Sequence, residues 1–148
     1  KYNSDISTST LIQKYLYYYM DKFDWKKHIS TVEKIYTKKF IECYSYINKR
    51  LGQRLKVIKT DGGINFFIEL SRGYFSRDFV DFMLKKRVVL QPGSIYFDNE
   101  IDDRFFRINI ARESVERVKE AVDIIADNLD DFYKEFNTLS IKSNSDLQ

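Results

Sequence analysis

The sequence predicts an α+β fold in which helices pack on a small, mostly antiparallel β-sheet. Apolar residues recur at steps of three and four over residues 11–19, 25–51, 79–84 and 115–136, which is the period of an amphipathic helix. Over residues 55–57, 64–70 and 105–110 they alternate with a period of two, which is typical of strands. The order of these segments gives two N-terminal helices, strands interrupted by one helix, and a long C-terminal helix.

The composition agrees with one globular domain in a reducing, cytoplasmic setting. The 148 residues are 43% hydrophobic and include 12 Phe and 11 Tyr, which is enough for a sizeable core. A net charge of +3 is too small to indicate nucleic-acid binding. Charged residues interrupt every apolar run well before the roughly 18 residues of a membrane span, so we expect no membrane partner. The polar start does not resemble a signal peptide, and one cysteine excludes an intramolecular disulfide.

The predicted helices differ in how they use their apolar residues. The last helix carries an unbroken apolar stripe from Val115 to Phe136. The second helix ends at Gly52, a residue that suits a helix C-terminus. The first helix has tyrosines on every side, so some rings must pack against another domain or another subunit; these are Tyr15, Tyr17, Tyr18 and Tyr19.

The boundaries and connections follow from polar and turn-forming residues. Residues 1–10 and 141–148 are polar and lack periodicity, so we expect a lead-in and a loose tail around a domain at 11–140. Ser76 is expected to cap the middle helix, and residues 88–90 to form a short strand that stops at Pro92. Between the first two strands, Asp61-Gly62-Gly63 fits either a tight hairpin or a looser connection.

Arg107 is unusual because it is a charged residue inside a predicted strand. The period of two places Phe106, Ile108 and Ile110 on one face of their strand and Arg107 with Asn109 on the other. A guanidinium forms a two-pronged hydrogen bond to a carboxylate. The chemistry alone supports equally a salt bridge within this domain and the binding of a carboxylate ligand.

Other chemistry finds little support in the sequence. No glycine-rich phosphate loop and no Cys or His metal motif is present. His28 is expected to be a surface or hydrogen-bonded histidine near a helix start, and Cys43 a buried thiol rather than a nucleophile. An acidic segment lacks the spacing of a calcium loop and is expected to be solvated; it contains Asp98, Glu100, Asp102 and Asp103. We therefore predict no catalytic residue and no metal ligand.

Four segments in order resemble the C-terminal small domain of the fold type I pyridoxal-phosphate-dependent aminotransferases. They span residues 55 to 129 and are the glycine-glycine strand at 61–70, the Pro-Gly-Ser turn at 88–94, the arginine strand at 107–111 and the closing helix. Further N-terminal, His28, Tyr36 and the pair Lys38-Lys39 resemble the GntR/MocR-type regulators that contain an aminotransferase-like domain, and also the aminoadipate-type aminotransferases. Ser7 to Gln13 resembles the stretch that follows the cofactor lysine.

This resemblance implies roles for particular residues and a missing neighbour. Arg107 would bind the α-carboxylate of an amino-acid substrate or effector, with Asn109 beside it to orient the guanidinium. The cofactor lysine and most pyridoxal-phosphate ligands would lie in a large domain upstream of Lys1. The chain would therefore be inactive alone and would hold no cofactor by itself. The full-length protein would form a homodimer, and DNA would bind only through a further winged-helix domain.

Three functions follow from these expectations. The first is the C-terminal domain of a GntR/MocR-type transcriptional regulator, which closes over the cofactor cleft and binds an amino acid. The second is the same domain of a genuine pyridoxal-phosphate-dependent aminotransferase. The third, from a different class, is a stand-alone interaction module that uses the tyrosine-rich first helix as its contact surface.

Overall fold

The computed structural model describes residues 9–96 and 103–145, with side chains in the last helix described as far as Phe136. The chain forms two compact units, residues 1–35 and residues 36–148. The helices in chain order are α1 Thr10–Lys22, α2 Trp25–Leu51, α3 Ser76–Lys85, a short 3-10 helix η1 Gly93–Tyr96, and α4 Val115–Ser145. The strands are β1 Lys56–Val57, β2 Asn65–Glu69, β3 Gln91–Pro92 and β4 Phe105–Asn109.

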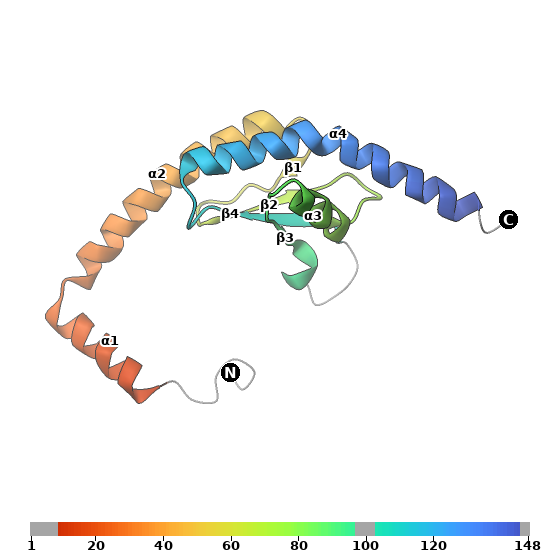
Figure 1. Cartoon of the computed structure of the whole chain (residues 1–148). Coiled ribbons are helices and arrows are strands. Elements are labelled where there is room, and N and C mark those ends of the chain that lie inside the picture. The colour runs from red at the N-terminus through yellow and green to blue at the C-terminus, as the bar shows by residue number, and fades with distance from the viewer. Residues whose placement is uncertain (1–8, 97–102, 146–148) are drawn as a thin grey trace. The chain divides into compact units, whose positions relative to one another are not determined.

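The strands of the described residues form one antiparallel sheet in the order β1-β2-β4-β3 (Figure 1). β2 and β4 are its long central pair, and Phe67 lies opposite Arg107. β1 and β3 pair through only two residues each and form the edges. The predicted α+β fold is confirmed, with two N-terminal helices, an antiparallel sheet and a long C-terminal helix.

The hydrophobic core lies between one face of the sheet and helices α2, α3 and α4. The two central strands contribute alternate residues to it, among them Phe66, Ile68, Phe106 and Ile108. Phe132 of α4 is fully buried and packs against the rings of two α3 residues, with centroid distances of 4.9 Å to Phe79 and 5.5 Å to Phe82. Because three helices cover this face, the side chains on the opposite face of β2 and β4 are not part of the core.

The C-terminal part of α2 runs along the first part of α4 on the sheet, as Figure 1 shows in yellow and in cyan to blue. Polar contacts join them on the side away from the core. Tyr46 and Arg50 of α2 both bond to Asp123 of α4, and Lys119 of α4 pairs with Glu42 of α2 at 2.6 Å. The two helices therefore form one layer with apolar contacts inside and charged contacts outside.

Some local predictions differ from the structure. Residues 88–90 do not join the sheet, because the Val88 N–H donates to the Met83 carbonyl at the end of α3 and the ladder starts only at Gln91. Ser76 is the first residue of α3 and does not cap it; its hydroxyl donates to Asp103. The connection between β1 and β2 is the looser one, and Gly63 has a φ of +106° there.

The C-terminal helix is longer than predicted. α4 continues to Ser145, whereas a loose tail was expected over 141–148. No Gly or Pro lies between Leu139 and Ser145, so the polar residues there carry no helix-stopping signal. No helix in the described part of the chain has the length and apolar character of a membrane span.

Candidate functional site

The candidate site lies on the face of the sheet opposite the core. β4 places Phe105, Arg107 and Asn109 on this face, because side chains alternate along a strand. Arg107 is opposite Phe67 on β2 and opposite Gln91 on β3. The guanidinium therefore originates near the middle of the sheet and not at its edge.

Two side chains hold the Arg107 guanidinium. Its Nη2 donates to the side-chain oxygen of Gln91. The ring of Tyr96 lies over it, with 4.8 Å from the guanidinium carbon to the ring centroid. The Tyr96 hydroxyl donates to the same Gln91 oxygen at 2.7 Å, so Gln91 joins the ring to the arginine. The three residues form one hydrogen-bonded group, which we call the Arg107 cluster.

Phe67 and Gly93 explain why Tyr96 lies there. Phe67 meets the Tyr96 ring edge-on at a centroid distance of 5.7 Å. Gly93 is buried, and a Cβ at this position would lie 2.5 Å from the Phe105 carbonyl oxygen. The chain can therefore pass close to β4 at Gly93, and the single turn of η1 then brings Tyr96 back over the sheet.

The charge of Arg107 has no carboxylate partner among the described residues. Arg104, three residues earlier, pairs with Glu69 at 3.0 Å, whereas no ion pair joins Arg107 to another described residue. Arg107 Nε is buried and donates to no hydrogen-bond partner in the described part of the chain. The salt bridge within the domain, which the sequence left open for Arg107, is thus not formed by those residues.

Asn109 shares the face with Arg107 but bonds elsewhere. Its side-chain amide donates to Asn65 at 2.7 Å, and its oxygen accepts the Ala111 N–H at 2.9 Å. Neither bond reaches the guanidinium. Gln91 and Tyr96 hold the arginine instead, and the sequence pattern predicted neither, because they come from an edge strand and a turn.

The remaining residues considered from the sequence form no second site. His28 is exposed near the start of α2. Cys43 is fully buried, and this burial raises the pKa of its thiol, so it stays protonated at neutral pH. Asp103 accepts the Ser76 hydroxyl, while Asp98, Glu100 and Asp102 lie outside the described residues. Within the described residues no group of three or more His, Cys, Asp or Glu could hold a metal ion.

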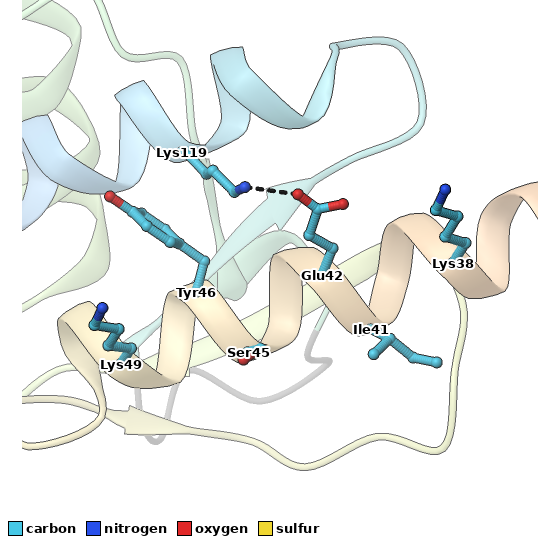
Figure 2. Close-up of a pocket in the computed structure, with 7 residues that line it drawn as sticks. All are labelled: Lys38, Ile41, Glu42, Ser45, Tyr46, Lys49 and Lys119. Atoms are coloured by element: carbon cyan, nitrogen blue, oxygen red, sulfur yellow. Dashed lines mark hydrogen bonds and ion pairs between the residues drawn. The ribbon is translucent and has the colours of Figure 1, made fainter.

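A second hollow lies along α2 and α4, with a volume of about 480 Å³ (Figure 2). Seven residues line it: Lys38, Ile41, Glu42, Ser45, Tyr46, Lys49 and Lys119. Lys119 pairs with Glu42 and lies 5.6 Å from the centre of the Tyr46 ring. The Lys119 ammonium is thus already paired with a carboxylate within the hollow.

The residues around Arg107 do not fit a pyridoxal-phosphate site. Gln91, Tyr96 and Phe67 surround the guanidinium and offer no amine for a Schiff base. Lys39, on α2, donates instead to the backbone carbonyls of Ala111 and Glu113. The Arg107 cluster offers one cation stacked on an aromatic ring, which suits an anion that carries an apolar group.

No family model matches this sequence, and no curated protein matches it significantly. Solved structures do match. An α-aminoadipate aminotransferase from Thermus thermophilus, in complex with N-(5′-phosphopyridoxyl)-L-leucine, aligns with 89% of this chain at a TM-score of 0.77 and 18% identity, over 34% of its own chain. A kynurenine aminotransferase from Pyrococcus horikoshii aligns with 77% of this chain at a TM-score of 0.70 and 20% identity, over 28% of its own.

An aspartate aminotransferase from Thermotoga maritima has a higher identity, 30%, over a shorter match. It covers 63% of this chain and 24% of its own chain at a TM-score of 0.52. The chain therefore has the fold of one part of an aminotransferase, and it spans about a third of the length of these structures or less.

Proposed function

We propose that this chain is the C-terminal, aminotransferase-like domain of a larger pyridoxal-phosphate protein, and that Arg107 binds the carboxylate of an amino-acid ligand. The carrying observation is the guanidinium on the face of the sheet opposite the core, which pairs with no carboxylate of the described residues. An arginine fork held by an aromatic ring is a suitable receptor for a carboxylate. The structural likeness to one part of several aminotransferases supports the same role.

In this proposal the cofactor and its lysine belong to a large domain outside this chain. The small domain would close over the cleft between the two and present Arg107 to the ligand, as lids do in many enzymes. We also propose that the full-length protein forms a homodimer. Asn109 would act indirectly, because its bonds to Asn65 and Ala111 fix the end of β4.

The finer proposal is a GntR/MocR-type regulator whose effector domain senses an amino acid. It rests on the order of His28, Tyr36 and Lys38-Lys39 along the sequence. In the structure, Tyr36 and Lys39 both donate to the Ala111 carbonyl, at 3.5 and 3.4 Å, so they tie α2 to the end of the strand that carries Arg107. In a regulator, this contact would couple α2 to ligand binding.

The second candidate is a genuine aminotransferase. The observation that favours it is that several solved structures with this fold are aminotransferases. The complete product of the gene separates the two candidates. A regulator binds duplex DNA from its own promoter region and transfers no amino group to 2-oxoglutarate. An aminotransferase transfers the amino group and does not bind this DNA.

The carboxylate role is tested on the complete gene product by titration with the twenty protein L-amino acids. The matched control ligands are the corresponding amino-acid amides, which lack the carboxylate. We expect Arg107→Ala to weaken the best ligand by about a hundredfold, since hydrogen bonds to charged groups contribute about 1.5–3 kcal/mol each. Arg107→Lys keeps the charge and loses the fork, so it recovers only part of the affinity. Equal affinity in all three proteins would contradict the role.

A further inference from the structure

The side-chain oxygen of Gln91 already occupies one donor of the Arg107 fork. It accepts a hydrogen bond from Arg107 Nη2 and another from the Tyr96 hydroxyl at 2.7 Å. A carbonyl oxygen has two acceptor sites, and both are used here. A ligand carboxylate that binds the guanidinium would present an oxygen at the same donor.

The neighbouring nitrogen on the same edge of the guanidinium, Nε, is buried and forms no hydrogen bond with the described residues. The Tyr96 ring lies over the guanidinium and is itself fixed edge-on by Phe67. A buried donor without an acceptor is unfavourable, so the cluster leaves one of the two nitrogens on the Nε–Nη2 edge of the guanidinium unsatisfied. A carboxylate that bridges Nε and Nη2 on this edge would compete with the Gln91 oxygen for Nη2.

The positions of Gln91 and Tyr96 in the fold allow Gln91 to be displaced. Gln91 lies on the edge strand β3, which pairs with β4 through two residues and has no strand on its other side. Tyr96 ends η1, a single turn, and 43% of its surface is exposed. Arg107 itself lies on the central strand β4, between β2 and β3. The cover thus lies on an edge strand and a single helical turn, and the receptor lies on a central strand.

We infer that Gln91 is an internal stand-in for the ligand carboxylate, held on Arg107 by Tyr96, and that ligands bind by displacing it. This inference rests on the proposed carboxylate role of Arg107 and adds how that site is regulated. Gln91 and Tyr96 are therefore positioning residues. Their contacts hold the guanidinium in place in the free protein and lower the affinity for any carboxylate that cannot displace Gln91.

The test measures ligand affinity by calorimetric titration of the complete gene product in five proteins: the wild type, Arg107→Ala, Gln91→Ala, Gln91→Glu and Tyr96→Phe. The probes are the twenty protein L-amino acids, with the amides as controls. Gln91→Ala removes the stand-in, and we expect the dissociation constant to fall on the order of tenfold, the effect of one net hydrogen bond. Gln91→Glu places a real carboxylate on the fork, and the dissociation constant should rise by at least as much. Tyr96→Phe keeps the ring and loses the hydroxyl, so it should lie between the wild type and Gln91→Ala.

The opposite directions of the two Gln91 variants separate this role from a structural one, because a loss of folding would weaken binding in both. Thermal unfolding of each variant checks that the fold is retained. Tighter binding by Gln91→Ala together with weaker binding by Gln91→Glu supports the inference. If Arg107→Ala loses the ligand but Gln91→Ala binds no tighter than the wild type, the inference fails and the carboxylate role stands. If Arg107→Ala binds like the wild type, both fail.

Discussion

At the scale of the residue, Arg107 combines a permanent charge with a place in the middle of the sheet. The sequence predicted its strand and its face, because an alternation of two along 105–110 allows only one assignment of sides. The partners Gln91 and Tyr96 were not predictable in the same way. They reach Arg107 across a strand pair and from a turn, at separations of 16 and 11 residues along the chain.

Gly93 supports the cluster through its lack of a side chain. A Cβ there would lie 2.5 Å from the Phe105 carbonyl oxygen and 2.8 Å from the Phe105 Cβ. We expect Gly93→Ala to lower the free energy of unfolding by about 1–3 kcal/mol, the usual effect of forcing extra volume into a packed site. Urea denaturation measures this. The neighbouring Ser94→Ala is the control and should change stability by less than about 0.5 kcal/mol; equal effects of the two substitutions would contradict the explanation.

At the scale of the element, the end of α3 holds an ordinary residue in an unfavourable conformation. Arg87 has a φ of +64°, the left-handed region that favours glycine. The N–H groups of Arg87 and Val88 donate to the Leu84 and Met83 carbonyls, which is the hydrogen-bond pattern of a Schellman motif. The helix end is thus satisfied in its hydrogen bonds and strained at one backbone position.

Arg87→Gly should therefore stabilise the protein. We expect a gain of about 0.5–1 kcal/mol in the free energy of unfolding, because glycine removes the contact between Cβ and the backbone in this conformation. The control is Lys86→Gly, where φ is −90° and no such relief is available. Chemical denaturation of both variants checks the prediction. A loss of stability at both positions would show that the left-handed conformation is not a source of strain.

The contact between α2 and α4 depends on the carboxylate of Asp123, which binds both Tyr46 and Arg50. The Tyr46 hydroxyl donates to both oxygens of Asp123, at 2.9 and 2.8 Å, and Arg50 pairs with the same carboxylate at 2.5 Å. The hydrogen bond to Asp123 raises the pKa of the Tyr46 phenol, because ionisation would place two negative charges together. The phenol therefore stabilises the helix pair only in its protonated form.

This contact makes a prediction about pH. Since the pKa of Tyr46 is higher in the folded than in the unfolded chain, its contribution is complete below about pH 10 and is lost as the pH rises through the folded value. The difference in unfolding free energy between the wild type and Tyr46→Phe should therefore shrink above about pH 10. Urea denaturation at several pH values measures it. In an Asp123→Asn background this pH dependence should disappear, and its persistence there would assign it to another group.

At the scale of the whole molecule, the first unit differs from the second in what it exposes. No residue of α1 is buried, although the helix is rich in large apolar side chains. Six of them are exposed by 56% to 73%: Leu11, Ile12, Tyr15, Leu16, Tyr17 and Tyr18. An apolar surface of this kind is normally covered by another domain or subunit. In our proposal the large domain covers it; in the interaction-module alternative another copy does.

A protein made of this chain alone should therefore self-associate through α1. We expect the double substitution Tyr17→Ser and Tyr18→Ser to shift the chain toward monomer, because it removes two of the most exposed rings. Light scattering at several concentrations measures the mass. The control pair, Asp21→Ser and Lys22→Ser, changes the same helix without removing apolar surface and should leave association unchanged. If the chain is a monomer both before and after the tyrosine substitutions, the hypothesis of an interaction module is wrong.

The sequence by itself determined the class of fold and the face on which Arg107 lies. Both follow from the spacing of apolar residues, which is local and can be counted along the chain. It did not determine the end of α4, because the polar residues there carry no helix-stopping signal. It did not determine the start of β3 either, because the Val88 N–H donates to the end of α3 and not to the sheet. Only the tertiary structure decided that Gln91 and Tyr96 meet at the guanidinium of Arg107. Strand pairing and the turn after Gly93 bring them together, and no local pattern records such a meeting.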